Sequence, residues 1–117
     1  MSSDLDRIIR NRQNLRTDAS NAATNAPDAL TAAIAQRLVS AMDTTIQSDV
    51  DWQLWINGPY SGAVSAGCDL ASAHQTDLWR TVDSEFTAAT TAKTSFINAY
   101  NNLASRLGVP QWSAGTF

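Results

Sequence analysis

Few side chains in this sequence could do chemistry, and they are thinly spread. Cys68 and His74 are the sole cysteine and histidine, six positions apart. On a helix that spacing puts a thiol and an imidazole about 120° apart, so the pair does not form a nucleophile and base on one face. We interpret Cys68 as a buried structural cysteine and His74 as a surface or capping residue.

A second candidate constellation follows His74. Asp77, Arg80 and Asp83 continue from it at three-residue spacing. Such a series is typical of a solvated ladder of ion pairs on one helix face, worth about 0.2–0.5 kcal/mol per pair. The alternative is a proton relay of His74 and Asp77 in a small helical enzyme or cofactor carrier. The ladder is the simpler interpretation, so we predict no catalytic residue.

Metal and cofactor motifs are also thin. Glu85 is the sole glutamate, whereas a di-iron helical bundle needs several glutamates and Glu-x-x-His pairs. A structural zinc site needs about four cysteine or histidine ligands. Neither a Gly-x-Gly-x-x-Gly nor a Walker-type loop occurs. The sequence predicts a protein with no cofactor, no metal and no small-molecule substrate.

Length and composition set the frame for these residues. The chain has 117 residues, a net charge of −3, 44% hydrophobic residues and 16% charged ones. We expect one domain, 1–117. No apolar run approaches the roughly 18–20 residues that a membrane span needs. The N-terminus lacks the apolar segment of a standard secretory signal, so we expect synthesis in the cytoplasm.

Hydrophobic spacing predicts the first two helices. Apolar residues at helical intervals predict an amphipathic helix over residues 3–17. Residues 17–26 are small and polar and read as a hinge, so 1–26 forms an N-terminal arm. A second helix is expected over 27–56, starting at Pro27. Its apolar stripe recurs every four residues and drifts around the helix, so its distal half must be covered from more than one direction.

The remaining elements follow from the glycines and prolines. Residues 57–62 (Asn-Gly-Pro-Tyr-Ser-Gly) predict a break. A third helix is expected over 63–107, followed by a non-helical tail, 108–117. Its apolar seam comprises Leu78, Val82, Phe86, Ala89, Phe96, Tyr100, Leu103 and Leu107.

The expected fold is all-α: an elongated antiparallel helical hairpin (27–56 and 63–107) with an N-terminal amphipathic helix. A break near Gly67 or Thr76 would instead permit a compact four-helix bundle.

The turn between the two long helices carries a family resemblance. Trp55-Ile56-Asn57-Gly58 resembles the Trp-x-Gly turn of the small WXG-type helical hairpins of type VII secretion, with one residue inserted. The family's C-terminal Tyr-x-x-x-Asp/Glu pattern has no match here, since Ala104 follows Tyr100 by four. The resemblance implies a secreted helical-hairpin protein that acts as a dimer.

Charge and aromatic residues suggest partner surfaces. Residues 1–16 hold four arginines against two aspartates, a local charge of +2, and the rest of the chain sums to −5. Nucleic acid, an anionic lipid surface and an acidic protein neighbour could each bind this arm. The acidic neighbour fits best, because the rest of the chain is acidic and nucleic-acid-binding proteins carry a larger basic surplus. A solvated helix face is the alternative. The predicted partner interface comprises Arg7, Arg10, Val50, Trp52, Leu54, Trp55, Trp79, Trp112 and Phe117.

The leading hypothesis is a non-enzymatic structural subunit that assembles with copies of itself and with other assembly subunits. A virion or phage particle is the expected setting, as a capsid-associated, connector or tail protein. The low charge and the stripe that travels around its helix motivate this hypothesis, because both indicate surface that neighbours cover.

Overall fold

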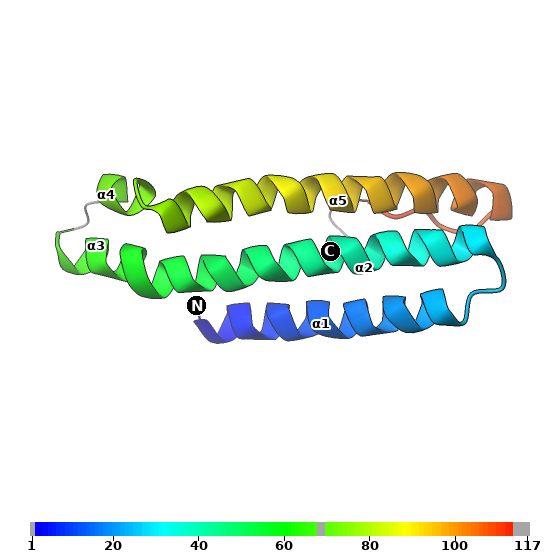
Figure 1. Ribbon diagram of the computed structural model, residues 1–117, viewed down its shortest axis with the longest axis horizontal. Coiled ribbons are helices and arrows are strands. Elements are labelled where there is room, and N and C mark those ends of the chain that lie inside the picture. The colour runs from blue at the N-terminus through cyan, green and yellow to red at the C-terminus, as the bar shows by residue number, and fades with distance from the viewer. Residues whose placement is uncertain (1, 68–69, 114–117) are drawn as a thin grey trace.

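The computed structural model describes residues 2–67 and 70–113, which form an all-α protein without strands. Three long helices lie side by side, with α2 (Ala29–Trp55) between α1 (Ser2–Thr24) and α5 (Asp77–Leu107) (Figure 1). The molecule measures 56 × 21 × 21 Å. The predicted elongated helical hairpin is confirmed as α2 and α5. α1 packs along the same central helix, and its Cα atoms stay more than 8 Å from those of α5.

α1 continues through the segment predicted as a hinge. It reaches Thr24 instead of ending near residue 17, so that prediction is wrong. Ala19 is buried in the core and anchors the additional turns. The Thr17 and Thr24 hydroxyls each donate to a carbonyl four residues earlier, at 3.1 Å. Polar side chains expected to compete with the helix are thus satisfied inside it.

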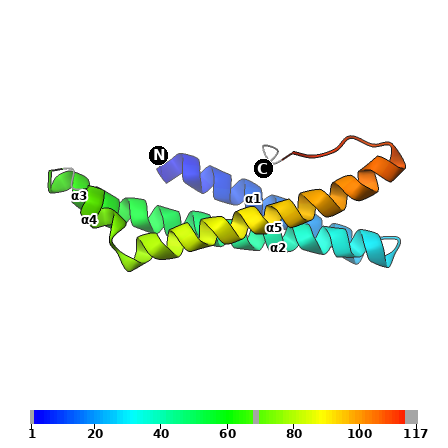
Figure 2. The ribbon, with the colours of Figure 1, turned by 90° about the horizontal axis from the view of Figure 1, so that it is seen from above.

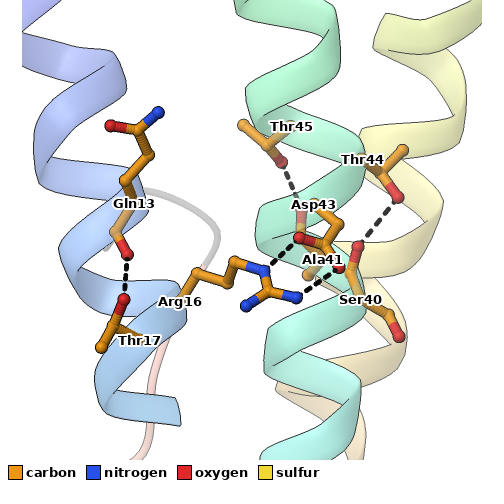
Figure 3. Close-up of polar contacts among 8 residues, drawn as sticks. All are labelled: Gln13, Arg16, Thr17, Ser40, Ala41, Asp43, Thr44 and Thr45. Carbon is orange, nitrogen blue, oxygen red and sulfur yellow. Dashed lines mark hydrogen bonds and ion pairs between the residues drawn. The ribbon is translucent and has the colours of Figure 1, made fainter. Parts of the chain in front are cut away.

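Ion pairs join α1 to α2. Arg12 pairs with Asp49, and Arg16 reaches across to Asp43, as Figure 3 shows for the second pair. The hydrogen bond and the charge of Asp43 raise the pKa of Arg16. Acidic residues of α2 therefore engage two of the four N-terminal arginines.

Asp28 caps the start of α2, because its carboxylate accepts the Thr31 N–H at 2.7 Å. That bond holds the pKa of Asp28 below its usual value. α2 ends at Trp55, but the chain does not break at 57–62 as predicted. Residues Ile56–Tyr60 form a π-helical turn, η1, that leads directly into the short α3 (Ser61–Ser65). In an α-helix the Pro59 ring would clash with the carbonyl four residues earlier, and proline has no N–H to donate to it. The wider π-helical turn gives that ring more room.

The segment expected as a third helix, 63–107, is divided into three helices, α3, α4 and α5, so its continuity, which the sequence left open, is interrupted. α3 ends before Gly67, whose φ is 97°, and α4 spans Leu70–His74. The Thr76 hydroxyl then caps α5 by accepting the Trp79 N–H at 3.2 Å. Breaks thus occur at both anticipated places, yet the compact bundle does not form. α5 alone has 31 residues, about 46 Å of helix.

Two hydrophobic clusters hold the helices together. The first joins all three long helices and contains Ala19, Ile34, Leu38, Ala41, Met42 and Phe96. The second lies at the end where α2 turns into α3 and α4, and contains Trp55, Ala63, Ala73 and Val82. Phe96, Val82 and Ala89 confirm parts of the predicted seam on α5. Phe86 and Leu107 do not, because they are 67% and 65% exposed.

The C-terminal tail folds back on the first cluster. α5 ends at Gly108, whose φ of 68° is the left-handed conformation that glycine adopts most readily. Asn101 then holds the Trp112 backbone twice: its Oδ1 accepts the N–H at 2.8 Å, and its Nδ2 donates to the carbonyl at 2.9 Å. The Trp112 ring lies 5.4 Å from Phe96 and 5.6 Å from Tyr100. Figure 2 shows the tail on the same side of the α2–α5 pair as the start of α1.

No helix in the described part of the chain is long and apolar enough to cross a membrane.

Candidate functional site

The most distinctive surface feature is a hollow between α1 and α5, floored by α2, which we call the α1–α5 hollow. Its volume is about 380 Å³. The apolar lining residues are Leu5, Ile8, Trp52, Trp79, Val82 and Phe86. The polar ones are Arg12, Ser48, Asp49 and Asp83. Its walls stand apart because α1 and α5 each pack on α2 and not on one another.

Helical spacing explains how each wall presents its side chains. Leu5 and Ile8 are one turn apart on α1, so both face the hollow, while Ile9 is buried against the protein interior. On α5, Trp79, Val82 and Phe86 recur at three- and four-residue intervals. Phe86 is 67% exposed, so an aromatic side chain protrudes at the edge of an apolar depression. A phenylalanine that belonged to the core would be buried, so Phe86 is not a core residue.

A charged pair forms part of the lining of the hollow. Arg12 and Asp49 form an ion pair whose side chains are 22% and 16% exposed. A second hollow of about 190 Å³ lies beyond them and includes Lys93 and Thr90 in its lining. Desolvation lowers the pKa of Lys93, the Arg12 charge lowers it further, and Asp49 opposes both. Arg12 and Asp49 therefore line both hollows.

The tryptophans of the predicted interface gather beside the hollow. Trp55 is only 3% exposed, and its Nε1 donates to the Ala73 carbonyl at 3.0 Å. Its ring centroid lies 4.7 Å from Trp79 and 5.2 Å from Trp52. Trp52 and Trp79, at 5.7 Å from each other, also line the hollow. Trp55 thus fills the core of its own chain, whereas Trp52 and Trp79 remain half-buried on the floor and wall.

His74 belongs to this aromatic cluster. Its ring stacks on Trp79 at 4.4 Å and on Trp55 at 5.6 Å. It lies in α4, whereas Asp77 starts α5, so the predicted four-residue ladder is not on one continuous helix. Asp77 pairs with Arg80 at 3.1 Å, which confirms one rung. Among the described residues no hydrogen bond or ion pair links His74 to Asp77.

The remaining predicted interface residues are dispersed. Val50 and Leu54, 36% and 56% exposed, lie on α2. Arg7 is exposed and pairs with Asp4 at 3.6 Å, and Arg10 is exposed nearby on α1. Trp112 packs within its own chain, as described above. Phe117 and Cys68 lie outside the described residues. The prediction that Cys68 is a buried structural cysteine therefore concerns a residue that the structure does not describe.

Sequence reasoning missed three residues that shape the hollow. Leu5 and Ile8 were assigned only to an amphipathic stripe, and Phe86 to a buried seam. The sequence did hold one signal for the hollow. The predicted apolar seam on α5 has more positions than α2 alone can cover. No group of three or more histidine, cysteine or acidic side chains in the described residues could hold a metal ion.

No known protein family, curated protein or solved structure matches this chain. Its function must therefore be argued from its own geometry.

Proposed function

We propose that the protein is a non-enzymatic structural subunit that assembles with copies of itself, and that a second copy covers the α1–α5 hollow. The observation that carries this proposal is the exposed Phe86 ring beside an apolar depression. Exposed apolar patches rimmed by polar residues are typical of interaction sites.

The shape of the patch favours a copy of the same chain. A protrusion, Phe86, and a depression, lined by Leu5, Ile8 and Trp52, lie together on one face. Under two-fold symmetry the same patch serves both subunits, so each Phe86 can enter the hollow of the other. In such a contact Phe86 and Trp52 would be buried at the centre. Buried aromatic residues at the centre of an interface commonly supply most of its binding free energy.

The primary test is the mass of the protein in solution. Light scattering or sedimentation at micromolar concentrations should give an oligomer for the unmodified chain. Phe86→Asp should give a monomer with unchanged helical circular dichroism, because the substitution adds charge to an exposed position. Leu107→Asp is the matched control: this equally exposed α5 residue lies away from the hollow and should leave the oligomer intact. A stable monomer of the unmodified chain would contradict the proposal.

The proposed setting is a virion or phage particle, in a capsid-associated, connector or tail position. Low charge supports it, because surface that neighbours cover needs few charges. Electron microscopy of the purified material would show rings, rods or shells if the subunit builds such a structure. Separate dimers alone would argue against the setting while leaving self-association intact.

A second candidate is a secreted WXG-like helical hairpin of a type VII system. What favours it is the position of Trp55 and Gly58, which lie where α2 gives way to the turn towards α5. Co-expression with an active type VII apparatus tests it: the protein should appear in the medium. Retention inside the cell would rule this candidate out.

A further inference from the structure

Ser48, which lines the α1–α5 hollow from α2, has a buried hydroxyl group that the chain does not use. Thr45 and Ser48 are both buried polar residues of α2, 3% and 6% exposed. The Thr45 hydroxyl donates to the Ala41 carbonyl at 2.6 Å. The Ser48 hydroxyl makes no hydrogen bond to another residue that the structure describes. Buried polar groups normally have a hydrogen-bond partner, so this hydroxyl indicates a partner that enters the hollow.

The charges around Ser48 favour a neutral partner. Arg12 donates from its Nη1 to the carboxylate of Asp49, and both side chains are mostly buried in the lining of the hollow. Their charges therefore balance within the chain. Asp83, the other charged lining residue, is exposed to solvent. A charged group brought beside Ser48 would lose its hydration without gaining an unpaired opposite charge, whereas a neutral hydroxyl can both donate to Ser48 and accept from it.

The rest of the hollow suits an aromatic molecule. The Trp52 and Trp79 rings lie 5.7 Å apart and are half-buried in its lining, with Phe86 at the rim. Aromatic pairs are attractive beyond the area that they bury. The volume of about 380 Å³ is within the range of sites for small molecules, which are mostly apolar and hold a few polar groups that orient the ligand.

We propose that the α1–α5 hollow binds a neutral aromatic molecule that carries one hydroxyl group. Its rings pack against Trp52 and Trp79, and its hydroxyl is hydrogen-bonded to Ser48. The ligand takes the space that Phe86 of a second copy fills under the proposed self-association, so ligand and second copy compete. Only this competition rests on the proposed function, because the site itself is complete in one chain.

Nuclear magnetic resonance with 2-naphthol as the probe tests the site. The probe has two fused rings and one hydroxyl that stays neutral at pH 7. Titration into ¹⁵N-labelled protein should shift the indole N–H signals of Trp52 and Trp79. The signal of Trp112, which packs on the other cluster, should stay in place. If the Trp52 and Trp79 signals do not move, the proposal is wrong.

Two related probes test the recognised chemistry. Naphthalene lacks the hydroxyl and should bind about five- to tenfold more weakly, the usual contribution of one hydrogen bond. 2-Naphthoate carries a charge and should bind more weakly than 2-naphthol. Tighter binding of 2-naphthoate would overturn the assignment of a neutral ligand.

Ser48→Ala tests the residue that orients the ligand. It should weaken binding of 2-naphthol by about five- to tenfold and leave the affinity for naphthalene unchanged. Alanine favours the helix and removes no hydrogen bond between described residues, so circular dichroism should show a folded protein. Ser40→Ala, a change at an exposed serine about two turns earlier on α2, should alter neither affinity. An equal loss for both probes in Ser48→Ala would show that the hydroxyl is not recognised.

Sedimentation separates this site from the proposed self-association. Saturating 2-naphthol should dissociate the oligomer, because the ligand displaces Phe86 of the second copy. Binding that leaves the mass unchanged would support the ligand site and contradict the Phe86 contact. The magnetic resonance titration is run at a chain concentration that gives monomers, so a second copy cannot mask the hollow. A monomer that shows no shift of Trp52 and Trp79 would overturn the ligand site, whatever the protein does at higher concentration.

Discussion

Phe86 and Phe96 are the same residue type on the same helix, ten positions apart, but one side chain is exposed and the other is buried. Phe96 is 3% exposed and belongs to the cluster that joins α1, α2 and α5. Phe86 is 67% exposed at the rim of the α1–α5 hollow. What differs is the cover. At Phe96 the tail returns and sets Trp112 against the ring.

The difference shows how three helices can be closed at one end and open at the other. Small residues such as Ala19 and Ala41 allow close packing around Phe96, and both are buried. Around Phe86 the neighbouring wall carries Leu5 and Ile8 across a hollow. Large apolar side chains line both walls here, and the tail does not cover them as it covers Phe96.

The largest expected effect tests this contrast directly. Phe96→Ala should lower the free energy of unfolding by about 3–5 kcal/mol, because it leaves a cavity among three helices. Phe86→Ala should change it by only about 0.5 kcal/mol when measured on the monomer, since the ring is already in water. Urea unfolding followed by circular dichroism measures both. Equal losses would mean that Phe86 is covered within its own chain.

An intermediate effect is expected at the tail. Trp112→Ala should cost about 2 kcal/mol, because the half-buried ring contacts both Phe96 and Tyr100. The same denaturant titration applies, with Val109→Ala as a control on an exposed tail residue. If Trp112→Ala were neutral for unfolding yet reduced oligomer mass, the tail would serve a neighbour and not its own core.

The smallest effect concerns the turn that sends the tail back. Gly108→Ala should destabilise by about 1 kcal/mol, because alanine is strained at a φ of 68° although nothing crowds the site. Gly62→Ala is the opposite control: Gly62 lies in α3 with open space around it, so alanine should stabilise by about 0.5–1 kcal/mol. Thermal unfolding would resolve both signs. Stabilisation by both substitutions would contradict the left-handed turn.

The long helices could be predicted from the sequence because their signals are local. The predicted start at Pro27, the apolar period of α2 and the Gly108 end all act within a turn or two of the helix they define, although α2 itself begins at Ala29 and its cap, Asp28, was not predicted. The predicted hinge failed for a non-local reason: Ala19 contacts a core that the other helices supply. Small polar residues that favour a loop in isolation are helical once one of their neighbours is buried.

The hollow could not be predicted for a similar reason. A repeating apolar stripe on α5 states which side chains share a face, but not how far along that face a partner extends. The stripe has phenylalanine at both positions 86 and 96, so residue type does not tell the covered ring from the exposed one. The tail covers only the first of these rings, and its return depends on Asn101, a polar residue to which the sequence pattern assigned no role. The anticipated all-round cover of distal α2 is partly met: Trp55 is buried, while Leu54 is 56% exposed.

The grip of Asn101 on Trp112 has one further consequence. A side-chain amide that pairs with both the N–H and the C=O of one residue makes the same two hydrogen bonds as a neighbouring β-strand would. Both bonds go to backbone atoms, so they do not depend on which side chain that residue carries. Asn101 therefore fixes the position along α5 at which the tail crosses the helix. The Trp112 indole determines only how closely the tail packs against it. Neighbouring tail positions such as Gln111 are left free to vary, so this part of the chain can change its surface without losing its place.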